Sequence, residues 1–303
     1  MPLRVAVAPE GVRGFCRDAV IAGGGELVPV GDADALVWTD PADSGALSEA
    51  LMQNPDISWV QLPWAGIEPL VGVLDADRTW TSGKGVYAEE VAEHALAMAL
   101  AGMRNLVGYA RQDHWSGPSG VNLLGAKVTM LGAGGIAASF ARMAAPFGVE
   151  LRVVRRSNEP FPGAAVTARF ERLDDLLPDT DLLVLALALT PETTGVIDAR
   201  RLALLPGHAW IVNVARGAHI VTDALADALE AGTIGGAALD VTDPEPLPDG
   251  HALWSLDRCL ITPHVANTPE MAVPVLSRRI TENVRRRIDG RPLIGVVDVV
   301  AGY

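Results

Sequence analysis

KVTMLGAGGIAASFARMAAPFG, residues 127–148, is the stretch that decides the fold. An apolar run leads into Gly132 and Gly134, Ala137 takes the third small position of a G-x-G-x-x-A pattern, and a helical pattern follows. This order is typical of dinucleotide binding, because the glycines let a pyrophosphate approach the backbone and the helix N-terminus. The motif alone leaves other nucleotides possible. We expect cofactor contacts from Gly132, Gly134, Gly135 and Ile136.

The sequence on both sides of this stretch alternates between short apolar runs and helical patterns. LRVAVA, ELVPV, ALVWT and SWVQLP lie within the first 63 residues, and ELRVV follows at residues 150–154. Such alternation predicts parallel strands joined by helices. A chain of 303 residues can also form two domains with separate cores. We therefore expect a two-domain α/β protein with a Rossmann-type doubly wound parallel sheet.

Three polar residues follow apolar runs in the second half of the chain. Arg216 follows AWIVNVA, Glu245 lies in GGAALDVTDPEP, and His264 lies in RCLITPHVA. Because ligands of open α/β sheets bind at the carboxyl ends of the strands, we expect these side chains to meet there. A guanidinium can hold a carboxylate in a fork, and an imidazole paired with a carboxylate can protonate a carbonyl oxygen. Taken alone, Arg216 could be a surface arginine, Glu245 a solvated carboxylate and His264 a structural residue. The prediction of a keto-acid site therefore depends on their joint order.

NVARG, LDVTDPEPLP and TPHVANTP together resemble the D-isomer-specific 2-hydroxyacid dehydrogenases, and the resemblance covers nearly the whole chain. It implies that Arg216 binds the substrate carboxylate and polarises the carbonyl, that Glu245 orients His264, and that His264 is the acid/base. It also implies that Ala215 and Asp240 belong to the cofactor site. For Asp240, a structural cap is the competing interpretation.

The resemblance further predicts the domain organisation. In this family the C-terminal helix returns to the first domain. The substrate domain is therefore expected to be flavodoxin-like and discontinuous, built from residues 1–98 and 270–303, with the dinucleotide-binding domain at residues 99–269. A helical pattern that starts at Ala88 is expected to link the two domains.

Arg155, Arg156 and Ser157 follow the strand after the glycine-rich turn. NAD-binding domains usually carry an acidic residue there, which holds the ribose hydroxyls. Two guanidinium groups and a hydroxyl suit the 2′-phosphate of NADP(H) instead. We therefore expect NADP(H) as the preferred cofactor, with NAD(H) possible. The alternative is a solvated arginine pair, since all basic residues except Lys84 and Lys127 are arginine.

The substrate side is inferred from weaker patterns. Trp64-Ala65-Gly66 resembles the family loop whose N–H groups face the substrate, and Trp38 and Trp64 could either shape a pocket or pack in the core. DPEPLPDGHALW resembles the glyoxylate/hydroxypyruvate reductase branch. We therefore expect the reduction of a small 2-oxo acid to the D-2-hydroxy acid. The alternatives are a 3-phosphoglycerate dehydrogenase-like enzyme that uses NAD and a dinucleotide-sensing interaction protein of the corepressor type.

The charge and composition of the chain exclude several classes of binding partner. A net charge of −13 argues against nucleic acid and anionic membranes. Cys16 and Cys259 lack a metal-ligand spacing, so neither a metal site nor a disulfide framework is indicated. The longest apolar run, residues 182–189, is too short to cross a bilayer. We expect a cytoplasmic protein that acts on a small 2-oxo or 2-hydroxy acid. We also expect a homodimer, since the segment after Met103, including Trp115, resembles the family's dimer contact.

Overall fold

The computed structural model describes residues 2–299. The chain divides into two compact units: the first contains Met1–Tyr87 with Thr268–Tyr303, and the second contains Ala88–Asn267. The expected boundary at residue 98 lies inside α3 (Ala88–Met103), which belongs entirely to the second unit. The break falls before this helix because its buried face covers the second sheet. No helix within residues 2–299 is long and apolar enough to cross a membrane.

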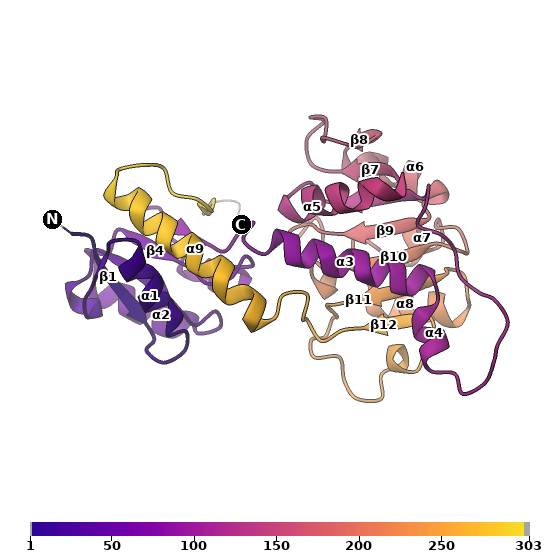
Figure 1. The fold of residues 1–303 in the computed structure, drawn as a ribbon, viewed down its shortest axis with the longest axis horizontal. Coiled ribbons are helices and arrows are strands. Elements are labelled where there is room, and N and C mark those ends of the chain that lie inside the picture. The colour runs from indigo at the N-terminus through magenta and orange to yellow at the C-terminus, as the bar shows by residue number, and fades with distance from the viewer. Residues whose placement is uncertain (1, 300–303) are drawn as a thin grey trace. The chain divides into compact units, whose positions relative to one another are not determined.

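The second unit is built on a seven-stranded parallel sheet of order β12-β11-β10-β9-β6-β7-β8 (Figure 1). The chain starts in the middle at β6 (Lys127–Leu131), moves to one edge, returns to β9 (Leu182–Leu185) and then moves to the other edge. The order therefore reverses between β6 and β9, where doubly wound sheets bind their ligands. The expected Rossmann-type sheet is confirmed. The other strands are β7 (Glu150–Val154), β8 (Val166–Ala168), β10 (Trp210–Asn213), β11 (Gly236–Leu239) and β12 (Cys259–Ile261).

Two apolar cores cover the opposite faces of this sheet. Along β9, Leu183 and Leu185 belong to one core, whereas Leu182 and Val184 belong to the other. This alternation follows from the two-residue period of a strand. Because both faces are covered, the strands read as continuous apolar runs in the sequence. α3 and α5 (Gly135–Ala144) pack on one face, and the other carries α6 (Leu173–Leu176), α7 (Ala199–Leu202) and α8 (Thr222–Glu230). A short helix, α4 (Leu106–Ala110), follows α3.

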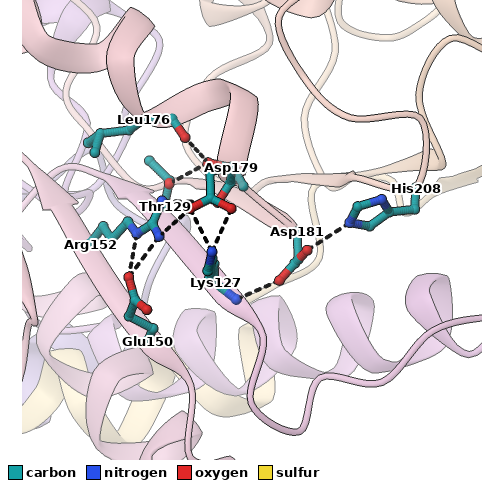
Figure 2. Close-up of polar contacts among 9 residues, drawn as sticks. Lys127, Thr129, Glu150, Arg152, Leu176, Asp179, Asp181 and His208 are labelled. Atoms are coloured by element: carbon teal, nitrogen blue, oxygen red, sulfur yellow. Dashed lines mark hydrogen bonds and ion pairs between the residues drawn. The ribbon is translucent and has the colours of Figure 1, made fainter.

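Charged residues gather at the amino ends of β6 and β7, away from the glycine-rich turn (Figure 2). Lys127 Nζ lies 2.6 Å from both carboxylate oxygens of Asp179, and Arg152 bonds to the same carboxylate over 3.0 Å and to Glu150 over 2.7 Å. Burial lowers the pKa of Arg152, but the hydrogen bonds to Asp179 and Glu150 outweigh it and raise the pKa overall. The network joins two strands to the turn before β9, so its role is structural.

The first unit is built on a five-stranded parallel sheet of order β2-β1-β3-β4-β5, which is the flavodoxin-like order that the resemblance implied. One core lies under α2 (Ser44–Gln53), and α1 (Phe15–Ala22) packs against the returning helix α9 (Pro269–Ile288) (Figure 1). Gly23 permits this packing, because a Cβ there would lie 2.6 Å from Val284 Cβ. The strands are β1 (Arg4–Ala8), β2 (Glu26–Leu27), β3 (Ala35–Trp38), β4 (Trp59–Gln61) and β5 (Thr79–Thr81).

Candidate active site

The glycine-rich turn joins β6 to α5 where the strand order reverses. Gly132 has a φ of +108°, and a Cβ there would lie 2.2 Å from the carbonyl oxygen of Ala186, so only glycine fits. Gly134 caps α5, and a Cβ there would meet no described atom within 4 Å. Gly135 and Ile136 open the helix, whose first turn has no acidic residue. The free N–H groups and the dipole of this end favour an anion, so the open space fits a dinucleotide pyrophosphate.

The residues expected to bind the 2′-phosphate follow β7. Arg155 is half-buried, and its Nη2 lies 3.4 Å from Oε2 of Glu159. Ser157 Oγ donates to the same oxygen over 3.4 Å, and Arg156 is exposed. A carboxylate thus faces two of the three expected phosphate ligands. Both contacts are long for charge-assisted hydrogen bonds, so an incoming phosphate can replace this carboxylate.

Arg216 follows β10 in a turn that Asn213 holds. Asn213 is buried, accepts the N–H of Ala215 over 3.1 Å and donates to the carbonyl oxygen of Arg216 over 2.9 Å. The Arg216 guanidinium in turn donates to the carbonyl oxygen of Ala215 over 2.7 Å. A Cβ on Gly217 would lie 1.9 Å from the carbonyl carbon of Thr242, so glycine lets the turn after β10 touch the turn after β11. Arg216 therefore lies next to the segment that carries Glu245.

Glu245 and His264 form a direct pair. His264 Nδ1 lies 2.7 Å from Glu245 Oε1, and about half of each side chain is exposed. Nε2 of His264 makes no hydrogen bond to any residue in the range 2–299. Because the carboxylate takes Nδ1, Nε2 is the nitrogen that can exchange a proton with a substrate. Together with Arg216, the pair lies beyond the carboxyl ends of three adjacent strands, β10, β11 and β12.

Asp240 holds the loop on which His264 lies. Its buried carboxylate accepts the N–H groups of Val265 and Ala266 over 2.9 and 3.1 Å and the Thr262 hydroxyl over 2.6 Å. Its carbonyl oxygen also accepts the N–H of His264 over 2.8 Å. These bonds hold His264 at a φ of +53°, a conformation that few non-glycine residues adopt. In this structure Asp240 is an anchor of the loop, and its expected place in the cofactor site stays a prediction.

Hydrogen bonds keep the Asp240 carboxylate charged. Burial raises its pKa, but hydrogen bonds from His94, Thr262, Val265 and Ala266 outweigh this effect and lower the pKa below its ordinary value of 3.8. His94 Nε2 lies 3.4 Å from the carboxylate and 3.1 Å from the Thr262 hydroxyl. The loop with the proposed acid/base residue is thus tied to α3, which carries His94.

The expected substrate loop belongs to the first unit and follows β4. The N–H groups of Ala65 and Gly66 donate to no described residue. Gly83 supports the loop: its N–H donates to the carbonyl oxygen of Trp64 over 2.7 Å, and a Cβ there would lie 3.2 Å from Ala65 N. Trp64 is partly exposed, whereas Trp38 is 2% exposed and packs in the core. Of the two tryptophans, only Trp64 has a surface that a ligand can contact.

Three residues of this site are missing from the sequence-based predictions. Asn213 had a signal, because a polar residue at the end of a continuous apolar run is expected to be buried with partners. Glu159 also had a signal, because an acidic residue only four positions after Arg155 is close enough in the chain to pair with its guanidinium. His94 had no such signal, because no local pattern links it to Asp240, which is distant in sequence. Only the folded sheet brings that pair together.

Comparison with known proteins identifies the family. The model of the D-isomer specific 2-hydroxyacid dehydrogenase NAD-binding domain matches residues 95–266. A Corynebacterium melassecola protein, described as an uncharacterized protein in the proB 3′ region, is 38% identical over 295 residues, covering 94% of this chain and 95% of the relative.

Solved structures agree. A D-isomer specific 2-hydroxyacid dehydrogenase from Xanthobacter autotrophicus Py2, in complex with NADPH and MES, superposes with a TM-score of 0.85 at 28% identity, covering 100% of this chain and 99% of the other. An NADPH-dependent glyoxylate/hydroxypyruvate reductase from Sinorhizobium meliloti, in complex with NADP and sulfate, gives a TM-score of 0.82 at 26% identity, covering 99% and 100%. The Corynebacterium relative and the two solved structures each cover at least 94% of this chain. This protein therefore belongs to the D-isomer-specific 2-hydroxyacid dehydrogenases, a family of NAD(P)-dependent oxidoreductases.

Proposed function

We propose that the protein reduces a small 2-oxo acid of the glyoxylate or hydroxypyruvate kind to the D-2-hydroxy acid with NADPH. The observation that carries the proposal is the pair of Glu245 and His264, 2.7 Å apart, beyond a strand adjacent to the one that leads to Arg216. A fixed imidazole and a guanidinium are the two groups that reduction of a keto acid requires from the protein.

The dinucleotide supplies the hydride that is added to C2 of the substrate. Gly132, Gly134, Gly135 and Ile136 would hold its pyrophosphate, since their turn is open and donor-rich. Ala215 is buried and its carbonyl oxygen accepts a bond from Arg216, so its proposed contribution to the cofactor site is through backbone shape.

The protein side of the reaction consists of orientation and proton donation. The Arg216 guanidinium holds the substrate carboxylate and polarises the adjacent carbonyl. His264 donates the proton from Nε2 to the carbonyl oxygen, while Glu245 stabilises the protonated ring and keeps Nδ1 occupied. Ala65 and Gly66 are proposed as further donors to the substrate, because their N–H groups have no described partner.

The preference for NADPH is proposed on the side chains after β7. Arg155, Arg156 and Ser157 offer charge and a hydroxyl to a 2′-phosphate. The relatives from Xanthobacter autotrophicus and Sinorhizobium meliloti contain NADPH and NADP, which supports the proposal. NADH remains the weaker alternative in this scheme, because Glu159 lies near the position where an acid would hold ribose hydroxyls.

A homodimer is also proposed. Trp115 is fully exposed, as are large parts of Leu106 and Leu124 at either end of the same segment. An exposed tryptophan is typical of a protein interface, where aromatic residues are enriched. The segment thus offers a contact surface for a second copy of the chain.

The function is tested by following NADPH absorbance with glyoxylate, hydroxypyruvate, pyruvate and phenylpyruvate as substrates. We expect rapid oxidation with the first two. The matched control is His264→Asn, which keeps a planar hydrogen-bonding side chain without an acid/base nitrogen and should lose turnover by roughly 10²–10⁴-fold. Equal NADPH oxidation by both proteins, or none by the wild type with any of the four acids, would contradict the proposal.

A further inference from the structure

Thr262 links helix α3 to the loop that carries His264. Its hydroxyl donates to the buried carboxylate of Asp240 over 2.6 Å, and its carbonyl oxygen accepts the N–H of His264 over 3.0 Å. On the other side, Nε2 of His94 lies 3.1 Å from the same hydroxyl oxygen. A chain of hydrogen bonds therefore runs from α3 to the backbone of the proposed acid/base residue.

The directions of these bonds follow from the hydrogens that each group carries. An ionised carboxylate only accepts, so the single hydroxyl hydrogen of Thr262 points to Asp240. The hydroxyl oxygen can then only accept from His94, which requires a hydrogen on Nε2. Nδ1 of His94 makes no hydrogen bond within residues 2–299. A neutral ring with its hydrogen on Nε2 meets these conditions, so His94 is a donor in this chain of bonds.

This donor matters because a hydroxyl hydrogen can rotate toward any acceptor nearby. The N–H of His94 occupies a lone pair of the Thr262 oxygen and leaves the hydroxyl hydrogen to Asp240, and linked bonds of this kind strengthen one another. Asp240 in turn accepts the two backbone N–H groups that follow His264 in the chain. The orientation of this carboxylate therefore helps to hold His264 at its φ of +53°.

The packing of α3 makes His94 a firm anchor. The helix packs against β10, β11 and β12, and Ala92 and Ala95 on either side of His94 are completely buried. The His94 side chain is only 23% exposed, whereas His264 and Val265 on the loop are exposed. A donor on a packed helix can thus support an exposed loop, and a catalytic group needs such support to keep one orientation.

We propose that His94 is a positioning residue, whose bond to Thr262 keeps the ring of His264 in the orientation for proton transfer. The inference rests on the proposed role of His264 as the acid/base residue. His94 itself touches neither substrate nor cofactor in this scheme. Its loss should therefore lower kcat, which depends on the orientation of the ring, and leave the KM values for hydroxypyruvate and NADPH nearly unchanged.

The test compares a variant that keeps the donor with one that removes it. His94→Gln offers an amide N–H near the position of Nε2, whereas His94→Leu fills the space without a donor. With hydroxypyruvate and NADPH, kcat of His94→Leu should fall by about 10-fold, within the roughly 100-fold that a small misplacement can cost. His94→Gln should retain kcat within about threefold of the wild type, because the donor is kept. Glu93→Gln, at an exposed position of the same helix, is the matched control and should behave as the wild type.

Thr262→Val removes the hydroxyl with little change of shape and tests whether His94 acts through it. In a double-mutant cycle, His94→Leu should lower kcat no further once the hydroxyl is absent. All variants are compared at equal concentrations of folded protein, determined by circular dichroism. Additive losses, equal losses in both His94 variants, or an unchanged kcat in His94→Leu would overturn the inference and leave the proposed function intact. No turnover by the wild type would instead contradict the proposed function, and with it the role of His94.

Discussion

His264 Nδ1 lies 2.7 Å from Glu245 Oε1, and both side chains are about half exposed. In this pair the carboxylate occupies one ring nitrogen, so the same contact sets the orientation of the ring and leaves Nε2 as the nitrogen that can reach a substrate. The contribution of the pair to catalysis can therefore be tested by replacing either partner.

Replacing Glu245 with Gln should lower kcat for hydroxypyruvate. An amide holds Nδ1 of His264 less firmly than a carboxylate does, so the ring loses the orientation that leaves Nε2 available for proton transfer. The measurement is kcat and KM for hydroxypyruvate at saturating NADPH. Asp249→Asn removes an exposed charge from the same loop and should leave both constants unchanged; an equal kcat in all three proteins would argue against the pair's role.

Replacing Arg216 with Lys should strongly weaken the use of substrate. An ammonium keeps the charge but cannot form the two parallel bonds of the fork. We expect kcat/KM to fall by about 10-fold to 100-fold, with NADPH affinity nearly unchanged. Arg258→Lys, at an exposed position before β12, is the control. Wild-type kinetics in the Arg216 variant would refute its role as the carboxylate ligand.

Replacing Asp240 with Asn should destabilise the loop that carries His264 in a pH-dependent way. The folded-state pKa lies below 3.8, so the stabilising contribution is complete above about pH 4 and is lost as pH falls through the lowered value. Loss of the charged acceptor should reduce the free energy of unfolding by roughly 1–3 kcal/mol near pH 7. Thermal midpoints are compared between pH 7 and pH 2.5. A difference between the variant and the wild type that stays constant down to the lowest pH would contradict this assignment.

Cofactor preference should respond in opposite directions to two changes after β7. The double variant Arg155→Asp, Arg156→Ala removes the attraction for a 2′-phosphate and offers a partner to ribose hydroxyls, so preference for NADPH should fall or reverse. Glu159→Gln removes the carboxylate that competes for Arg155 and should raise NADPH preference by up to about fivefold. The ratio of kcat/KM for the two cofactors measures both. Equal use of NADH and NADPH by the wild type would leave these arginines as solvated surface charges.

The exposed segment around Trp115 should mediate dimer formation. A fully exposed tryptophan between two exposed leucines would lose most of its apolar surface from water in an interface. Sedimentation at micromolar concentration should show a dimer in the wild type and a weaker one in Trp115→Ser. Trp254→Ser, which changes a partly exposed tryptophan elsewhere in the same unit, is the control. Monomer alone in the wild type would contradict the proposal.

Local sequence patterns determined the helices and strands and the α/β class of the fold. The apolar runs became buried parallel strands, and Gly132 and Gly134 formed the turn between β6 and α5, because period and turn chemistry act over a few residues. Family motifs indicated Arg216, Glu245 and His264. Their order along the chain, each after its own strand, was enough to predict a common edge of the sheet.

Only the tertiary structure decided how those side chains are held. The bond of His94 to Asp240, the approach of Gly217 to Thr242 and the stacking of Arg13 on Trp64 join segments that are distant in sequence. No local pattern encodes such pairs, because each depends on strand order and on which loops the sheet places side by side. The boundary at residue 87 rather than 98 has the same cause: a helix joins the core that buries its apolar face, and that core exists only after the sheet has formed.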